Sequence, residues 1–360
     1  MKIDDKTSHN SPSLRFPEFT GEWEYFSIND VCSEFKSGKN IKADLISSNG
    51  NFPVYGGNGL RGYTSSYNHD GLYVLIGRQG ALCGNVRSVF GKIYITEHAI
   101  AVAGNEKSDT YFLHYLFLKM NLGQYSDQSA QPGLAVNKLL KLKVLLPSIS
   151  EQIKIAKLLS LLDERIAVQS RLIDRLQSLM KGIRHRIINE AKGKIVCLCE
   201  VSDIYQPQTI SSADLTETGY PVYGANGIIG HYTSYNHEAE QVCITCRGNT
   251  CGRVNYTKSK SWITGNAMVV NVDRYQNIVS KRYLYHYLSN CDFNSIISGS
   301  GQPQIVRAPL AKFKIILPTV MQQYKIAHCL DVIQNKINVN RNILNLLIRQ
   351  KQYLLRKMFI

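Results

Sequence analysis

The chain has 360 residues, 44% of them hydrophobic, and 42 Lys and Arg against 27 Asp and Glu give it a formal net charge of +15. This length argues against a single core and fits two domains of roughly 150 residues. The polar, acid-bearing start and the lack of any apolar run near the roughly 20 residues of a membrane helix predict a cytoplasmic protein without signal peptide or membrane segment.

The first elements are an irregular stretch and an aromatic one. Residues 1–13 are polar, and we expect them to be disordered. Residues 14–26 read LRFPEFTGEWEYF, and so many aromatic side chains should pack onto the first domain.

The stretch that follows occurs twice. Residues 52–102 and 220–270 align without a gap at an offset of 168, with 22 identical residues in 51 positions. The shared residues include the motif PVYG-x-NG and the run Ser-Tyr-Asn-His. Such similarity indicates an internal duplication, and every motif has to be interpreted in both copies.

Within each copy, turn motifs alternate with short runs of β-forming residues, such as Leu72–Ile76 and Ala99–Val102. This pattern predicts a β-rich domain. A helix and then a short strand follow in each half: Asp109–Leu122 and Lys141–Leu146 in the first, Ser280–Cys291 and Lys312–Leu317 in the second.

Each half ends in a long segment with apolar residues at heptad spacing. The a/d positions run from Leu159 to Ile187 and from Leu330 to Met358, which predicts two helices of about 40 residues that pair with each other. A Ser or Thr followed by Glu or Gln should cap both helix starts. The segments are basic, with 10 Lys and Arg against 5 acids in residues 148–194 and 7 against 1 in residues 319–360.

Together these elements predict an α+β fold in which two repeated β-rich domains are separated by two long helices. The helices should form an antiparallel coiled coil and give the molecule a pseudo-two-fold arrangement. The expected divisions are a disordered N-terminus (1–13), a first domain (14–147), a first helical region (148–194), a second domain (195–318) and a second helical region (319–360).

Motifs of catalytic or metal chemistry are weak. Gly57–Gly62 matches GxGxxG, but a strand-like run follows it, so a loop needing positive φ is the better interpretation. Cys243, Cys246 and Cys251 could hold zinc, yet the first copy keeps only Cys83. No triad or acidic cluster appears. We therefore expect a non-catalytic protein without metal or cofactor, whose nine cysteines are reduced thiols.

The two copies differ most in polar loop residues, and a basic chain suggests a nucleic-acid partner. One shared scaffold with different polar loops fits two domains that recognise two different short nucleic-acid sequences. Neutral drift of surface loops would also produce such differences. Arg and Lys suit guanine, whereas Gln and Asn suit adenine. With the glutamines of the two S-x-QP turns, the predicted DNA-binding residues are Arg61, Arg78, Gln79, Gln131, Arg247, Asn249, Lys258 and Gln302.

The whole pattern resembles the specificity (S) subunits of type I restriction-modification systems. The features that carry the resemblance are the LRFPEF…W opening, the duplicated PVYG-x-NG segments, the S-x-QP turns, and the duplicated LP-x(4)-Q-x-K-I-A before each long helix.

The resemblance implies two target-recognition domains that each read half of a split sequence in double-stranded DNA. It also implies helical regions that dock two methyltransferase (M) subunits, with nuclease/translocase (R) subunits joining the complex. Methyl transfer and cleavage would then belong to those partners. A DNA-targeting subunit of a related methylation-only or other modification or defence system is the alternative.

Overall fold

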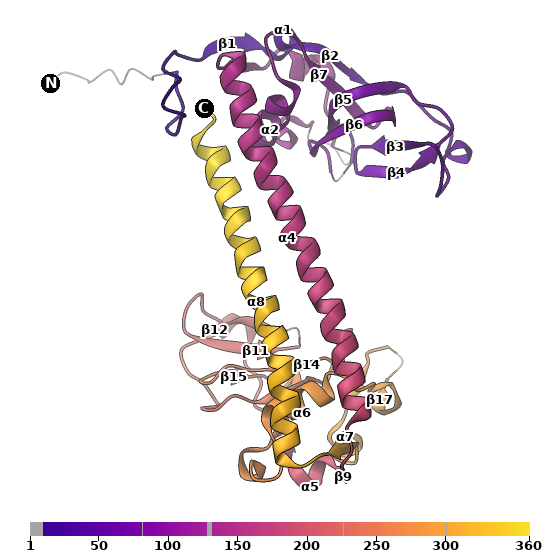
Figure 1. The fold of residues 1–360 in the computed structure, drawn as a ribbon, viewed down its shortest axis with the longest axis vertical. Helices are drawn as coiled ribbons and strands as arrows, with labels where there is room; N and C mark the ends of the chain where they lie inside the picture. Colours follow the sequence, from indigo (N-terminus) through magenta and orange to yellow (C-terminus); the bar gives the residue numbers. More distant parts are fainter. Residues whose placement is uncertain (1–9, 81, 128–131, 226, 300) are drawn as a thin grey trace, which may run out of the picture. The chain divides into compact units, whose positions relative to one another are not determined.

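The computed structural model describes residues 10–80, 82–127, 132–225, 227–299 and 301–360 (Figure 1). The chain forms two compact units. Unit 1 contains the chain up to Ser170 together with Ile343–Ile360, and unit 2 contains Arg171–Asn342. Most of the expected disordered stretch, residues 1–13, lies outside the described residues.

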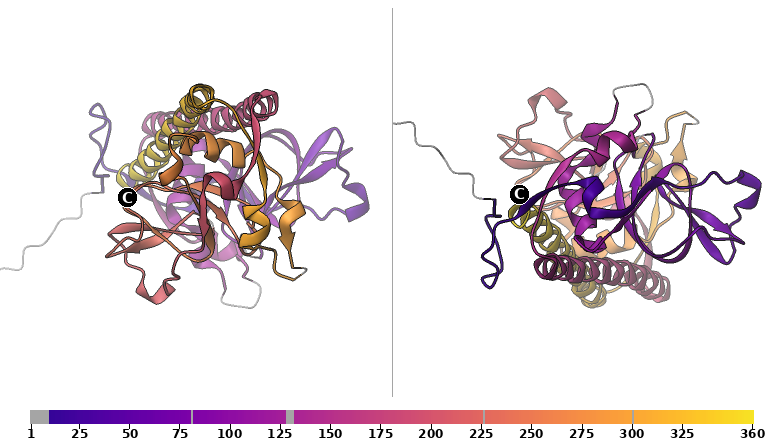
Figure 2. Two further views of the ribbon diagram at one scale, coloured as in Figure 1. Left: turned by 90° about the horizontal axis from the view of Figure 1, so that it is seen from below. Right: turned by 90° about the horizontal axis from the view of Figure 1, so that it is seen from above.

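Unit 1 is built on a six-stranded sheet of order β2-β7-β5-β6-β3-β4, and a separate antiparallel pair joins β1 to β8. The strands lie beside the long helices in this unit (Figure 2, right). The predicted strands Leu72–Ile76 and Ala99–Val102 fall inside β5 and β7 and are confirmed. Its elements are β1 (Glu24–Ser27), α1 (Ile28–Val31), β2 (Cys32–Ser37), η1 (Ala43–Leu45), β3 (Phe52–Gly56), β4 (Gly59–Thr64), β5 (His69–Gly77), β6 (Val86–Ile95), β7 (Ala99–Gly104), α2 (Thr110–Met120), η2 (Leu122–Tyr125), α3 (Val136–Leu140), β8 (Lys143–Leu146) and the first part of α4 (Ile149–Glu190).

Unit 2 repeats this plan with shorter strands, which form one sheet of order β10-β16-β13-β14 and another of order β12-β11-β15. Here β19 pairs with β9 as β8 does with β1. Its elements are β9 (Lys194–Cys197), α5 (Leu198–Val201), β10 (Asp203–Tyr205), η3 (Ser212–Asp214), β11 (Tyr220–Gly224), β12 (Gly227–Tyr232), β13 (Val242–Thr245), β14 (Val254–Tyr256), β15 (Trp262–Ile263), β16 (Ala267–Asn271), η4 (Asp273–Tyr275), α6 (Lys281–Leu288), η5 (Asn294–Ile296), β17 (Ile297–Ser298), β18 (Gln304–Ile305), α7 (Arg307–Ala311), β19 (Lys314–Leu317) and the first part of α8 (Val320–Lys357).

The sheet is continuous in unit 1 and divided in unit 2, and the two units differ at a facing pair of glycines in β5 and β6. Gly71 and Gly91 face each other across β5 and β6, with φ angles of +128° and +102° that favour glycine. Ala239 and Ser259 occupy the equivalent positions in unit 2. The long strand β6 is there replaced by two short ones, β14 and β15.

Hydroxyl and carboxylate caps set the starts of several helices. Asp109 accepts a hydrogen bond from the Phe112 N–H at 2.8 Å and begins α2, as expected. The expected capping box of α8 is also present, since the Gln322 side chain accepts from the Thr319 N–H at 3.3 Å. At the start of α4, Glu151 instead accepts two hydrogen bonds of 2.7 Å from Arg15.

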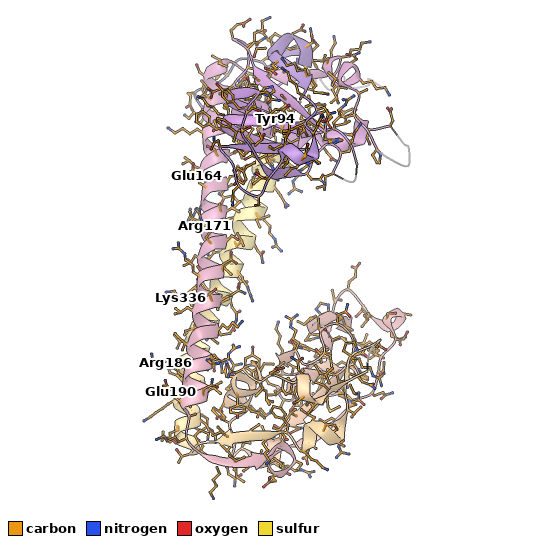
Figure 3. The ribbon with its side chains drawn as sticks, turned by 90° about the vertical axis from the view of Figure 1, so that its right-hand side faces the viewer. Tyr94, Glu164, Arg171, Arg186, Glu190 and Lys336 are labelled. Carbon is orange, nitrogen blue, oxygen red and sulfur yellow. The ribbon has the colours of Figure 1, made fainter. Side chains whose placement is uncertain are left out.

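The long helices pair antiparallel within each unit, and the predicted heptad seam is confirmed there (Figure 1). In unit 1, Leu159 of α4 and Met358, just beyond α8, are buried in one core. In unit 2, Met180 packs with Leu330 and Ile337. Charged side chains project outward from α4, including Glu164 and Arg186 (Figure 3).

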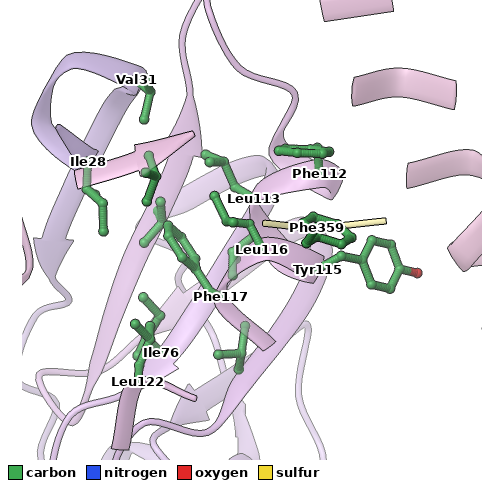
Figure 4. Packing of buried hydrophobic residues seen from close by; sticks show 14 of the residues in the cluster. Ile28, Val31, Ile76, Phe112, Leu113, Tyr115, Leu116, Phe117, Leu122 and Phe359 are labelled. Carbon is green, nitrogen blue, oxygen red and sulfur yellow. The ribbon is translucent and has the colours of Figure 1, made fainter. Parts of the chain in front are cut away.

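The core of unit 1 contains Trp23 of the aromatic N-terminal segment together with Phe359. Figure 4 shows Phe359 beside Phe112 in this core. Phe359 stacks on Phe112 with ring centroids 5.1 Å apart, and both rings meet Trp23 edge-on. Trp23 is only 2% exposed, and Phe16 and Phe26 pack against the same core, which confirms the expected packing for these three rings. Tyr25 is 61% exposed and does not take part. Fully burying an aromatic ring stabilises the fold by about 1.5–3 kcal/mol.

No helix in the described ranges has both the length and the apolar character needed to cross a membrane.

Candidate nucleic-acid interface

Three backbone hydrogen bonds in unit 1 hold the loop that follows β5. The Arg78 N–H donates to the His98 carbonyl at 2.9 Å, and the Leu134 N–H donates to the Arg78 carbonyl at 2.9 Å. The Gly80 N–H donates to the Pro132 carbonyl at 3.0 Å. Residues from three distant parts of the sequence thus meet at one place.

Unit 2 repeats the same three hydrogen bonds after β13. The Cys246 N–H donates to the Asn266 carbonyl, the Ile305 N–H to the Cys246 carbonyl and the Gly248 N–H to the Pro303 carbonyl, each at 3.0 Å. The backbone frame of the loop is therefore duplicated, while most of the side chains that it carries differ.

In unit 1 this frame surrounds an open hollow of about 430 Å³. Backbone packing requires glycine in its floor, because a Cβ on Gly57 would lie 2.8 Å from the His98 carbonyl oxygen. The equivalent residue in unit 2 is Ala225. The lining residues are Gly56, Gly57, Asn58, Arg61, Gln79, Gly80 and His98.

Two of the predicted DNA-binding residues, Arg61 and Gln79, line this hollow, and both are exposed. Arg78 is half-buried, and its backbone belongs to the frame described above. Gln131 lies outside the described residues. The sequence therefore named two of the side chains that surround the hollow of unit 1.

The four predicted residues of unit 2 are all exposed. Arg247 occupies the position of Gln79 and forms a β-bridge with Gln304, and Asn249 lies in the turn that follows it. Gln302 precedes Pro303, so it lies beside the same frame. Lys258 is separate, because it lies in the gap between β14 and β15, where its N–H donates to the Tyr223 hydroxyl at 3.1 Å.

Positive charge is left uncompensated around these loops. Within the described residues, Arg61, Arg78 and Arg247 take part in no salt bridge. The Arg87 guanidinium also lies against Gly59, next to the β3–β4 turn. Free guanidinium groups on exposed loops suit the phosphates and guanine edges of DNA.

The sequence interpretation missed His98. Its Nδ1 atom lies 3.1 Å from Oε1 of Gln79, and its Nε2 atom lies 3.2 Å from Oε1 of Glu97. The equivalent residue in unit 2 is the exposed Asn266. The aligned copies could have pointed to His98, because they differ there (His98 against Asn266). This position directly precedes the β-forming run that begins at Ala99.

The cysteines of unit 2 do not form a metal site in the described part of the chain, where no group of three His, Cys, Asp or Glu side chains could hold an ion. Cys243 is buried in the sheet, and burial raises its thiol pKa to about 12. Cys246 accepts a hydrogen bond from the Gln206 amide at 3.1 Å.

In unit 1, polar contacts attach helix α2 to the long helices α4 and α8. In unit 1 the Tyr115 hydroxyl donates to Asp163 at 2.9 Å, and Lys351 donates to the same carboxylate at 2.5 Å. Burial, with Lys351 adding to its effect, lowers the pKa of the neighbouring His114 to about 4. These contacts hold α2 against α4 and α8, and we interpret them as structural contacts and not as a ligand site.

Comparison with known families gives two matches along the chain. The family model described as type I restriction modification DNA specificity domain matches residues 20–178 and 191–349. The two matched ranges cover most of the chain, and each contains one copy of the duplicated frame.

Curated relatives point the same way. The EcoprrI specificity subunit of a type I restriction enzyme from Escherichia coli is 45% identical over 154 residues, which span 42% of this chain and only 38% of that subunit. A putative type I restriction enzyme specificity subunit, S.HindORF215P of Haemophilus influenzae, is 24% identical over 361 residues, 92% of each chain.

Solved structures share the fold. The S subunit of a type I restriction-modification system from M. genitalium aligns with a TM-score of 0.76 at 18% identity, over 97% of this chain and 99% of that one. A chain from a study of complex assembly in the type I R-M system aligns with a TM-score of 0.55 at 17% identity, over 96% and 99%. On the two matches of the family model, this chain belongs to the type I restriction modification DNA specificity domain family.

Proposed function

We propose that this chain is the DNA sequence-specificity subunit of a type I restriction-modification complex. It reads a bipartite target in double-stranded DNA, with one half-site for the recognition domain of residues 14–147 and one for that of residues 195–318. The observation that carries the proposal is the duplicated backbone frame with different side chains at equivalent positions, such as Gln79 and Arg247. Two readers on one scaffold would recognise two different sequences.

The proposed contacts are of two kinds. Arg61, Gln79, Arg247 and Asn249 are exposed beside the two frames and would reach base edges. Arg78 and Gln302 lie at the borders of the same loops, and Lys258 lies apart, between β14 and β15. These three residues would contact phosphates or bases, and Gln131 completes the set predicted from the sequence. Phosphate contacts would fix the position of each domain on DNA, and base contacts would supply specificity.

The helical regions 148–194 and 319–360 would dock two methyltransferase subunits. An exposed apolar stripe at heptad spacing supports this docking, because such a stripe is costly to leave in water. Its members on α8 are Val332, Val339, Leu346 and Tyr353, which are 55%, 57%, 62% and 49% exposed. Leu161 and Val168 of α4, 54% and 56% exposed, occupy the positions equivalent to the first two.

In this proposal the chain itself is not catalytic, and the M and R subunits carry methyl transfer and DNA cleavage. The test is to produce the chain together with the M subunits of its own genome in a host free of this system. We expect a stable complex and a methylated bipartite motif with two unrelated half-sites. M subunits without this chain should leave the host genome unmethylated.

Two results would contradict the proposal. One is a chain that remains separate from the M subunits during gel filtration, and the other is a complex that methylates a single continuous site. Phage plating with and without R subunits then separates a restricting system from the alternative, a subunit of a methylation-only or other modification system.

A further inference from the structure

The hollow of unit 1 holds a hydrogen bond that decides what its glutamine can offer to DNA. Oε1 of Gln79 lies 3.1 Å from Nδ1 of His98. An amide oxygen can only accept, so the ring nitrogen donates. Nε2 of the same ring lies 3.2 Å from Oε1 of Glu97.

This contact changes the usual role of glutamine. A free Gln reads adenine with both ends of its amide, since its oxygen accepts from N6–H₂ while its nitrogen donates to N7. The contact with His98 occupies one of the two lone pairs of Oε1 and fixes the orientation of the amide, so the N–H₂ is the end left fully free to contact a base. Gln79 then presents mainly donors.

The neighbouring Arg61 side chain also offers only hydrogen-bond donors. Arg61 is exposed on β4, lines the same hollow and brings a guanidinium with five N–H donors. A base edge suited to these donors must offer acceptors, and guanine offers two in the major groove, N7 and O6. Adenine and cytosine each present an amino group there, which would face donors, and thymine offers only one acceptor, O4, beside its methyl group.

We propose that His98 is a specificity-determining residue that sets the hollow of unit 1 to guanine by holding the Gln79 amide oxygen. The inference rests on the proposed function and assigns the base class that one domain takes. Asn58 also lines the hollow, but unit 2 has Asn226 at that position, so the shared residue cannot distinguish the two half-sites. The discriminating positions are 61, 79 and 98.

Unit 2 shows how the same positions can be used differently. The residues equivalent to Arg61, Gln79 and His98 are Ile229, Arg247 and Asn266. An arginine at the central position offers donors without help from a neighbour, and no imidazole is present to hold a glutamine. His98 is thus specific to the unit that carries Gln79.

The experiment measures DNA binding by the complex with M subunits. Each guanine of the two half-sites is replaced in turn by 7-deazaguanine, which lacks the N7 acceptor. We expect one guanine in one half-site at which this change weakens wild-type binding on the order of 10- to 100-fold. In His98→Leu the same change should cost little, and adenine should be accepted at that position.

Asn266→Leu is the matched control, because it alters the equivalent position of unit 2. It should leave the sensitive guanine of the first half-site unaffected. If His98→Leu fails to assemble with M subunits, Gln79→Met replaces it, since the exposed side chain can change without disturbing the core. That variant should also lose the sensitivity to 7-deazaguanine.

An assembled variant that keeps the full sensitivity would overturn the role of His98. So would a wild-type complex that is insensitive at every guanine. Failure of the proposed function is distinguishable, because the wild-type complex would then show no methylated bipartite motif at all.

Discussion

Nε2 of His286 on α6 lies 2.7 Å from Oδ1 of Asp331 on α8, and the imidazole is fully buried. The same carboxylate binds the Arg282 guanidinium, whose central carbon lies 4.4 Å from the centre of the Tyr256 ring. Burial raises the pKa of Asp331, but the hydrogen bonds from His286 and Arg282 outweigh it and bring the pKa to about 2. The Asp331 carboxylate therefore links α6 to α8 within unit 2.

Replacing this carboxylate should destabilise unit 2. Asp331→Ala leaves the Arg282 charge and the buried His286 ring without their partner, and we expect a loss of about 2–3 kcal/mol in the free energy of unfolding. Urea unfolding followed by circular dichroism measures it. Arg186→Ala is the control, because its ion pair with Glu190 is exposed on α4 (Figure 3) and should contribute much less. Equal losses in the two variants would contradict a special role for Asp331.

Acid should destabilise unit 1 through His114. Its pKa is about 4 in the folded chain, lowered by burial and by Lys351 against the opposing effect of Asp163, while an unfolded histidine has a pKa of about 6.5. Between these values the unfolded chain binds more protons, so stability is fully present above pH 6.5 and falls as the pH drops towards 4. The loss should reach roughly 2–3 kcal/mol.

His114→Leu provides the check on this pH dependence. Trp23 fluorescence in a Trp262→Phe background reports unfolding of unit 1, since Trp23 lies 6.1 Å from Phe112 in that core. Between pH 7 and 4.5 the stability of the variant should fall less steeply than that of the parent. Identical slopes would assign the acid sensitivity to other groups.

The C-terminus should be essential to the core of unit 1. Phe359 is 3% exposed and stacks on Phe112, so Phe359→Ala should cost about 3–4 kcal/mol of unfolding free energy. Ile360→Ala is the matched control, because Ile360 is 45% exposed and its loss should be small. Urea midpoints of the two variants, read from Trp23 fluorescence, decide between a packed and a dispensable C-terminus.

Arg247 should affect one half-site only. It is exposed in the frame of unit 2, so Arg247→Ala should weaken binding of the cognate target by about 1–3 kcal/mol and relax a single position. Methylome sequencing of the complex shows which half-site changes. Equal weakening of both half-sites would instead identify Arg247 as a phosphate contact or a folding residue.

Periodicity and repetition along the chain were sufficient for the architecture. The aligned copies predicted two equivalent β-rich domains, and the heptads predicted the helix pairing that buries Met180 against Leu330. Both signals are local, because a heptad places its apolar residues on one face of a helix wherever that helix lies. Cap residues such as Asp109 and Thr319 act on their own helix and were predictable for the same reason.

The tertiary structure decided which side chains meet. His98 follows β6, whereas Gln79 follows β5 and Arg61 lies on β4, so only the pairing of these strands brings all three to one hollow. The contact of His286 with Asp331 joins residues 45 positions apart. Such neighbours depend on the sheet order and on the packing of α6 against α8. Neither propensity nor spacing encodes these contacts, because they are made between elements and not within one.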